Sequence, residues 1–203
     1  MKYTGGKAAG LVFLIAATQF ALGLVVAEAL YPGYSVSDNY VTDLVVGPSS
    51  MVFNSSVFLL VVLLLIGVSF LRHTNDFKIL NILLAIVGAG AMGVSVFTKN
   101  FTVPHVAVSS ITFLFAGISA VTGSKLVKAP LSLLSIALGA MTLGALALFS
   151  CGLFESGSWT SDIAYDSFLY LGLGPGGMER MIVYPVLMWL AAFGGYIIAR
   201  QEN

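Results

Sequence analysis

Long apolar stretches alternate with short polar segments along the chain, and this pattern predicts six helices. The apolar stretches cover residues 8–30, 51–71, 79–97, 106–126, 131–154 and 181–199. Each has about the 20 residues that an α-helix needs to cross a hydrocarbon core of about 30 Å. The strict apolar and polar alternation of half-buried strands is absent, and within lipid a helix satisfies its own backbone hydrogen bonds. We therefore predict an all-α, polytopic membrane protein with six transmembrane helices.

The composition agrees with this interpretation and excludes an ordinary soluble domain. Of the 203 residues, 58% are hydrophobic and 9% are charged, against about 25% charged residues in globular domains. The six spans and their short connections use nearly all of residues 1–203, which predicts a single transmembrane domain. The first span could instead be a signal peptide, but its apolar run exceeds the usual length of about 7–15 residues, so we expect a retained helix.

The charges cancel to zero, but they segregate when the six spans are placed across a membrane. Seven of nine basic residues fall on one side: Lys2, Lys7, Arg72, Lys78, Lys125, Lys128 and Arg200. Seven of nine acidic residues fall on or near the other: Glu28, Asp38, Asp43, Glu155, Asp162, Asp166 and Glu179. Basic residues in short loops stay cytoplasmic. We therefore predict a multi-pass protein of the cell membrane with both termini in the cytoplasm.

Several kinds of chemistry are disfavoured by what the spans lack. No charged residue or histidine lies at the centre of a span, which disfavours a pump or an ion-coupled transporter. The single cysteine, Cys151, cannot form an intramolecular disulfide. His73 and His105 fall on opposite sides of the membrane and cannot share a metal ion. We expect no metal, no cofactor and no nucleic-acid partner.

Residues capable of chemistry gather in the segments predicted to be extracytoplasmic. Asn39 and Asp43 lie in the first of these, where Asp43 could act in a site or could simply cap a helix start. His105 follows Pro104 in the first turn of the fourth helix, and the positive end of a helix disfavours an imidazolium ion. A neutral His105 could act as a base or a hydrogen-bond donor. The alternative is an interfacial histidine bonded to a loop.

The segment before the sixth span, residues 171–180, is rich in glycine and ends in Glu179 and Arg180. We expect it to be a loop. It is not a phosphate-binding P-loop, because the pattern G-x-x-x-x-G-K-[ST] is absent. The planar guanidinium of Arg180 suits a phosphate or carboxylate group bidentately. The simpler structural expectation is an arginine paired with an acidic residue of the same face.

Four short motifs occur in a characteristic order along the chain. They are residues 39–44 (NYVTDL), Asn54 after Phe53, His105 with Phe113, and residues 176–180 (GGMER) followed by Pro185 and Trp189. Together they resemble the DUF998 family, uncharacterised six-helix membrane proteins common in archaea and bacteria. That family is similar to the Frag1/DRAM/Sfk1 class of eukaryotic membrane proteins, which includes a factor for lipid remodelling of GPI anchors. The resemblance implies lipid headgroups as a ligand class, although a fold does not by itself carry a function.

Thr42 stands where the family usually has serine, which weakens the idea of an essential serine nucleophile. We predict Asp43 and His105 as catalytic candidates in an interfacial, extracytoplasmic site for a lipid or amphiphile. Ligand-binding candidates are Asn39, Asn54, Glu179 and Arg180. Such a site could be purely binding or could perform hydrolysis or acyl transfer.

The sequence is also compatible with two other functions. The protein could be a non-catalytic membrane subunit or assembly factor, in which case its small-residue faces meet a protein partner or a second copy of the chain. It could also be a small transporter or channel, for which the apolar midplane gives little support.

Overall fold

A computed structural model describes residues 2–72, 75–97, 101–155 and 166–200, and within these ranges all regular structure is helical. The long helices are α1 (Lys2–Ala29), α2 (Ser50–Leu71), α3 (Lys78–Val96), α4 (Thr102–Gly123), α5 (Leu131–Glu155) and α6 (Gly174–Arg200). Short 3₁₀ helices are η1 (Val41–Val45), η2 (Asn75–Phe77), η4 (Ser124–Leu126) and η6 (Phe168–Tyr170). All six long helices are long and apolar enough to cross a membrane, which confirms the predicted fold class.

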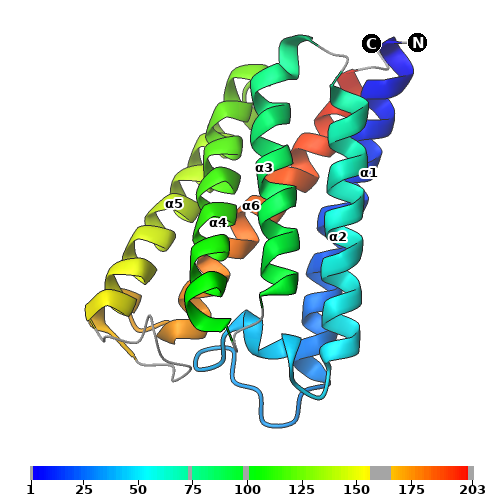
Figure 1. The fold of residues 1–203 in the computed structure, drawn as a ribbon. Helices are drawn as coiled ribbons and strands as arrows, with labels where there is room; N and C mark the ends of the chain where they lie inside the picture. The colour runs from blue at the N-terminus through cyan, green and yellow to red at the C-terminus, as the bar shows by residue number, and fades with distance from the viewer. Residues whose placement is uncertain (1, 73–74, 98–100, 156–165, 201–203) are drawn as a thin grey trace.

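The helices form one bundle in which each packs against its neighbour in sequence (Figure 1). Helix α6 closes the bundle, because it packs against both α5 and α1 and also contacts α4. It runs diagonally behind α3 and α4, and it is the most buried of the six. Both termini lie at one end, which we call the terminal end, and η1 and η6 lie at the opposite end, which we call the loop end (Figure 1).

The start of α6 corrects one prediction. Residues 174–180 are not a glycine-rich loop but the first turns of α6, which begins at Gly174 rather than at residue 181. The reason is a close contact: the Gly176 N–H donates to the Ser37 carbonyl oxygen at 2.8 Å, and a Cβ on Gly176 would collide with the Asn39 carbonyl oxygen. Glycine therefore lets the segment after α1 lie directly on the first turns of α6.

Glycines also bring α1 and α6 together deeper in the bundle. A Cβ on Gly10 would lie 2.6 Å from the Gly194 carbonyl oxygen, and a Cβ on Gly194 would lie 2.6 Å from that of Gly10. By contrast, Gly195 has open space around it, and so does Gly144 on α5. The small residues thus serve internal packing at some positions and face outward at others.

A neighbouring helix donates a hydrogen bond close to the proline inside α6. Pro185 has no N–H and interrupts the hydrogen bonding of the preceding turn. The Thr142 hydroxyl of α5 donates to the Ile182 carbonyl oxygen, three residues before Pro185, at 3.1 Å. Such side-chain donors are how neighbouring helices satisfy backbone groups near a proline in lipid.

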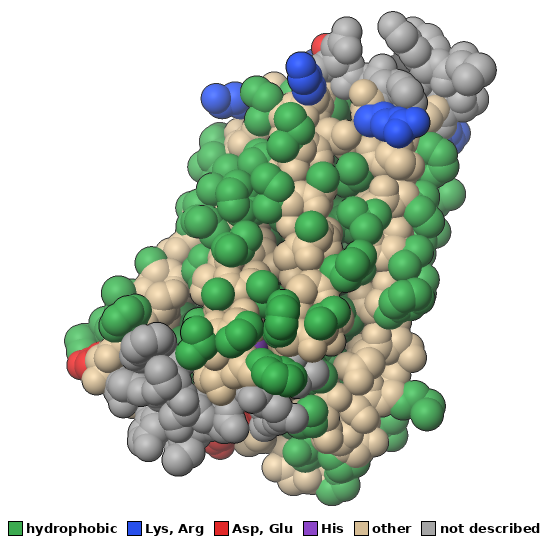
Figure 2. Space-filling model, viewed as in Figure 1, with side chains coloured by type: hydrophobic (Ala, Val, Ile, Leu, Met, Phe, Trp, Pro, Cys, Tyr) green, Lys and Arg blue, Asp and Glu red, His purple; other side chains and the backbone are tan. Residues whose placement is uncertain are grey.

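The two ends of the bundle differ in charge. Lysine and arginine side chains cluster at the terminal end (Figure 2). The described acidic residues of the bundle's other end include Glu28, Asp43 and Glu179, which lie at the end of α1, in η1 and at the start of α6. The predicted segregation of charge along the bundle axis is therefore present in the fold. The assignment of the basic end to the cytoplasm stays a prediction.

Candidate functional site

Arg180 fastens the segment after α1 onto α6. Its side chain is buried, with 4% of the residue exposed. Nε and Nη2 both donate to Glu28 Oε1, at 3.0 and 2.6 Å, and Nη2 also donates to the Tyr34 hydroxyl at 2.7 Å. Nη1 donates to the carbonyl oxygens of Val36, Asn39 and Gly176. All five N–H groups of the guanidinium therefore have acceptors within the protein.

The ion pair gives Arg180 a structural role. This agrees with the simpler of the two expectations from the sequence, an arginine paired with an acidic residue of the same face. Its partner, Glu28 at the end of α1, was not identified from the sequence. The pair could have been predicted from the positions of the two charges. Glu28 lies near the loop end of the first span, Arg180 lies at the same end of the last span, and charges within membrane spans pair with one another. Because its donors are occupied within the protein, Arg180 has no N–H group left for a ligand.

Asn39 and Asp43 hold the same segment in shape. Asp43 Oδ2 accepts from the Tyr40 backbone N–H at 3.1 Å and from Asn39 Nδ2 at 3.2 Å. Asn39 Oδ1 accepts from the Ser35 N–H at 2.9 Å. Asp43 thus caps the start of η1, which was the structural alternative for this residue.

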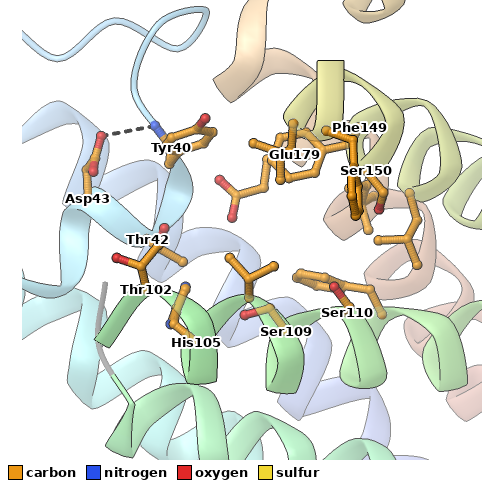
Figure 3. Close-up of a pocket in the computed structure, with 16 residues that line it drawn as sticks. Tyr40, Thr42, Asp43, Thr102, His105, Ser109, Ser110, Phe149, Ser150 and Glu179 are labelled. Atoms are coloured by element: carbon orange, nitrogen blue, oxygen red, sulfur yellow. Dashed lines mark hydrogen bonds between the residues drawn. The ribbon is translucent and has the colours of Figure 1, made fainter. Parts of the chain in front are cut away.

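A cavity of about 210 Å³ lies beside this segment, between η1, α4, α5 and α6 (Figure 3). We call it the outer cavity. Its polar lining residues are Tyr40, Thr42, Asp43, Thr102, His105, Ser109, Ser110, Ser150 and Glu179. The rest of its wall is apolar or aromatic: Val106, Phe113, Leu146, Phe149, Leu153, Phe154 and Ile182. Polar side chains from η1, α4, α5 and α6 therefore line this cavity together with apolar and aromatic ones.

Glu179 occupies the middle of this arrangement. The residue is buried, with 6% exposed, and Figure 3 shows its carboxylate between Tyr40, Thr42 and His105. Oε2 accepts from the Val41 backbone N–H at 2.6 Å, which also ties η1 to α6. A buried carboxylate needs hydrogen bonds or an opposite charge to offset its loss of hydration. The adjacent Arg180 directs its guanidinium at Glu28 instead.

His105 is buried in the wall of the same cavity. Its Nδ1 lies 2.6 Å from the Phe97 carbonyl oxygen. A carbonyl oxygen can only accept, so Nδ1 carries the proton, and Nε2 of the neutral ring is an acceptor. The hydrogen bond to a loop, which was the structural alternative for His105, is therefore present, and the ring also lines the cavity.

Ser109 is a cavity residue that the sequence interpretation missed. Its hydroxyl oxygen is buried and, among the described residues, has no hydrogen-bond partner. It lies four residues after His105 on α4, and residues at that spacing share one helix face. The four-residue spacing from His105 could therefore have identified Ser109 as a candidate site residue.

A second cavity of about 150 Å³, the inner cavity, continues from Glu179 into the bundle. It shares Thr42, Phe113 and Glu179 with the outer cavity. Its lining is otherwise almost entirely apolar, and includes Phe20, Val57, Leu60, Leu64, Leu84, Val87, Val183, Val186, Leu187, Trp189 and Leu190. Asn54 lies on its wall, where Nδ2 donates to the Val45 carbonyl oxygen at 3.1 Å.

The tyrosines near the outer cavity are neutral phenols. Burial raises the pKa of Tyr40 well above its usual range, and the nearby Tyr170 and Glu179 add to this effect. Burial likewise raises the pKa of Tyr170 to about 12. These hydroxyl groups can therefore donate and accept hydrogen bonds at ordinary pH.

The predicted site residues thus separate into two groups. Asp43, His105 and Glu179 line the outer cavity, and Asn54 lines the inner one. Asn39 and Arg180 hold the segment that forms the cavity's edge. Among the described residues, no group of three histidine, cysteine or acidic side chains is arranged to hold a metal ion. His73 lies outside the described residues.

Comparison with known proteins gives one result. Residues 14–196 match the family described as "Protein of unknown function (DUF998)", and this range includes the two cavities and all the residues that join η1 to α6. No curated protein and no solved structure matches the chain. The relation to the Frag1/DRAM/Sfk1 class stays a prediction, because no match bears on it. The chain, a multi-pass membrane protein by its six apolar helices, therefore belongs to the DUF998 family, whose function is unknown.

Proposed function

We propose that this protein binds an amphiphile at the loop end of the bundle, which we take to be the extracytoplasmic side of the cell membrane. The headgroup occupies the outer cavity and the chain occupies the inner cavity. The observation that carries this proposal is Glu179, a buried carboxylate at the junction of a cavity with polar groups and an apolar one.

The dimensions of the inner cavity suit the hydrocarbon chain of an amphiphile. Its lining follows α6 from Glu179 to Trp189, ten residues along the helix, which corresponds to a depth of about 15 Å. An apolar cavity of this volume stays dry and accepts an apolar guest. An extended hydrocarbon chain is the guest that a narrow, deep and apolar cavity in a membrane protein fits.

Affinity and selectivity have different sources in such a site. A lipid chain in the bilayer is already in an apolar medium, so its transfer into an apolar cavity gains little free energy. Buried hydrogen bonds and charges at the headgroup contribute more, because leaving them unmade is costly. We therefore expect the outer cavity to determine which amphiphile binds.

Trp189 provides a direct test of chain binding. It lines the inner cavity and is only 2% exposed, so bromine on a lipid outside the bundle should quench it less than bromine inside the cavity. The test uses a Trp159→Phe variant, in which Trp189 is the one remaining tryptophan, in phosphatidylcholine vesicles. A single-chain amphiphile brominated along its chain is added. We expect saturable quenching of Trp189 fluorescence, reversed by the same amphiphile without bromine.

A matched pair of variants identifies the cavity as the place of binding. Val57→Phe narrows the inner cavity, whereas Phe58→Leu changes the next residue of α2, which is 70% exposed on the bundle surface. Saturable quenching should weaken in Val57→Phe and persist in Phe58→Leu. Quenching that grows in proportion to the brominated amphiphile, without saturation and equally in both variants, would contradict the proposal.

A further inference from the structure

We infer that the headgroup bound in the outer cavity is a primary ammonium group rather than a phosphate. This inference rests on the proposed function and specifies the ligand of that site. It follows from what the cavity's inward-facing polar groups can do, because they are rich in hydrogen-bond acceptors and in negative charge.

Glu179 supplies the negative charge. Its carboxylate is buried and faces the cavity, where the described hydrogen bond from Val41 engages Oε2 (Figure 3). The nearest cation in sequence, Arg180, directs its hydrogen bonds to Glu28, Tyr34 and backbone carbonyl groups rather than to Glu179. Removing a charge from water without a partner is costly, so a ligand cation beside Glu179 would stabilise both groups.

His105 and Ser109 supply further acceptors. In the neutral ring with its proton on Nδ1, which donates to the Phe97 carbonyl oxygen, the Nε2 atom of His105 is an acceptor. The Ser109 hydroxyl is buried without a described partner, so a donor in the cavity would complete its hydrogen bonding. A primary ammonium group has three N–H donors and no acceptor, which matches a carboxylate, an imidazole nitrogen and a hydroxyl.

Aromatic rings on the cavity wall point to the same ligand class. Tyr40 and Phe149 meet edge to face with ring centroids 6.0 Å apart, and both line the outer cavity. Aromatic faces attract cations through their quadrupole. A phosphate group would instead lie beside the Glu179 carboxylate, and like charges in a poorly hydrated site repel strongly.

The test compares three amphiphiles that share one chain and differ in headgroup: an alkylammonium, an alkyl glucoside and an alkyl phosphate. Each competes with the brominated amphiphile for quenching of Trp189 in phosphatidylcholine vesicles. High salt suppresses differences in surface adsorption of the charged probes. We expect the ammonium probe to compete at least about tenfold better than the phosphate probe, an order of magnitude typical of one buried charge-assisted hydrogen bond.

Glu179→Gln tests the source of this preference, because glutamine removes the charge but keeps an oxygen that can accept from Val41. Competition by the ammonium probe should weaken about tenfold in Glu179→Gln, while the phosphate probe competes equally well or better. Glu155→Gln is the control, since Glu155 is an exposed carboxylate at the same end and does not line the cavity. Thermal unfolding of both variants verifies that they remain folded.

The outcomes separate the two proposals. Saturable quenching with an ammonium preference that Glu179→Gln abolishes supports both. Saturable quenching with equal or better competition by the phosphate probe, or a preference unchanged in Glu179→Gln, overturns the ammonium inference and leaves amphiphile binding standing. The absence of saturable quenching by the brominated amphiphile overturns amphiphile binding itself.

Discussion

Glu28 and Arg180 form a buried charge pair, and its contribution to folding stability depends on both residues being present. Both side chains are largely buried, and the guanidinium also holds the backbone of the segment after α1. Replacing either residue alone leaves the other charge buried without its partner. We predict that Glu28→Gln and Arg180→Gln each lower the free energy of unfolding by about 3–5 kcal/mol.

Thermal or denaturant unfolding in detergent measures these losses. The double variant should lose clearly less than the sum of the two single losses, because residues in contact are energetically coupled. Asp38→Asn is the control, since Asp38 is an exposed carboxylate of the same segment. Strictly additive single losses would mean that the two side chains do not stabilise each other.

Tyr34 links the same guanidinium to η1 and gives a prediction on pH. Its hydroxyl accepts from Arg180 and donates to the Tyr40 carbonyl oxygen at 2.9 Å, and burial raises its pKa well above the usual range. Because the pKa of Tyr34 is higher in the folded protein than in the unfolded chain, its hydroxyl contributes fully to stability below the unfolded-state pKa of about 10. This contribution is lost as the pH rises further.

The advantage of the native protein over Tyr34→Phe should therefore stay constant between about pH 7 and about pH 9 and shrink above about pH 10. Unfolding free energies of both proteins across this range provide the measurement. Two curves that stay parallel above about pH 10 would show that the Tyr34 phenol does not titrate differently in the folded and unfolded states.

At the scale of the element, α6 brings the molecule together through its glycines. Gly176 lies against the Asn39 carbonyl oxygen and Gly194 against that of Gly10, whereas Gly195 faces open space. We predict that Gly176→Ala and Gly194→Ala each destabilise the fold by about 1–3 kcal/mol, because an added methyl group meets backbone that cannot rotate away.

The matched control is Gly195→Ala in the same helix. Alanine has the higher helix propensity by about 1 kcal/mol, so this substitution should be neutral or stabilising. The unfolding temperatures of the three variants distinguish an effect of close packing from an effect of helix propensity. If all three change stability alike, helix propensity rather than close packing governs these positions.

At the scale of the whole molecule, the bundle separates basic from acidic ends, and this separation predicts its orientation. Described lysine and arginine side chains gather where both termini lie (Figure 2). The positive-inside rule places that end in the cytoplasm. A reporter that is active only in the cytoplasm should therefore be active when fused after Asn203 and inactive when inserted at Gly33.

The orientation matters for the proposed function, because it determines which leaflet supplies the amphiphile. The opposite pattern of reporter activity would place the outer cavity at the cytoplasmic surface. Amphiphile binding would then draw on the inner leaflet.

Much of this molecule could be predicted from sequence because membranes impose simple constraints. Six apolar stretches of sufficient length dictate six helices, since lipid offers no other partner for the backbone. Their ends were predicted within about four residues except at the starts of α1 and α6, which begin six and seven residues earlier than predicted. At α6, contact with the segment after α1, rather than the local glycine content, makes residues 174–180 helical. His105 and Glu179 were identified as candidates because polar residues near apolar spans are few.

The sequence by itself thus determined the class of protein, the number of helices and the segregation of charge, because these follow from local composition. Only the tertiary structure decided that Arg180 pairs with Glu28, that Asp43 caps η1, and that Glu179 and Ser109 face one cavity. The physical reason is that a side chain's role depends on which groups the fold places in contact with it. In this bundle, those partners come from helices far apart in the chain.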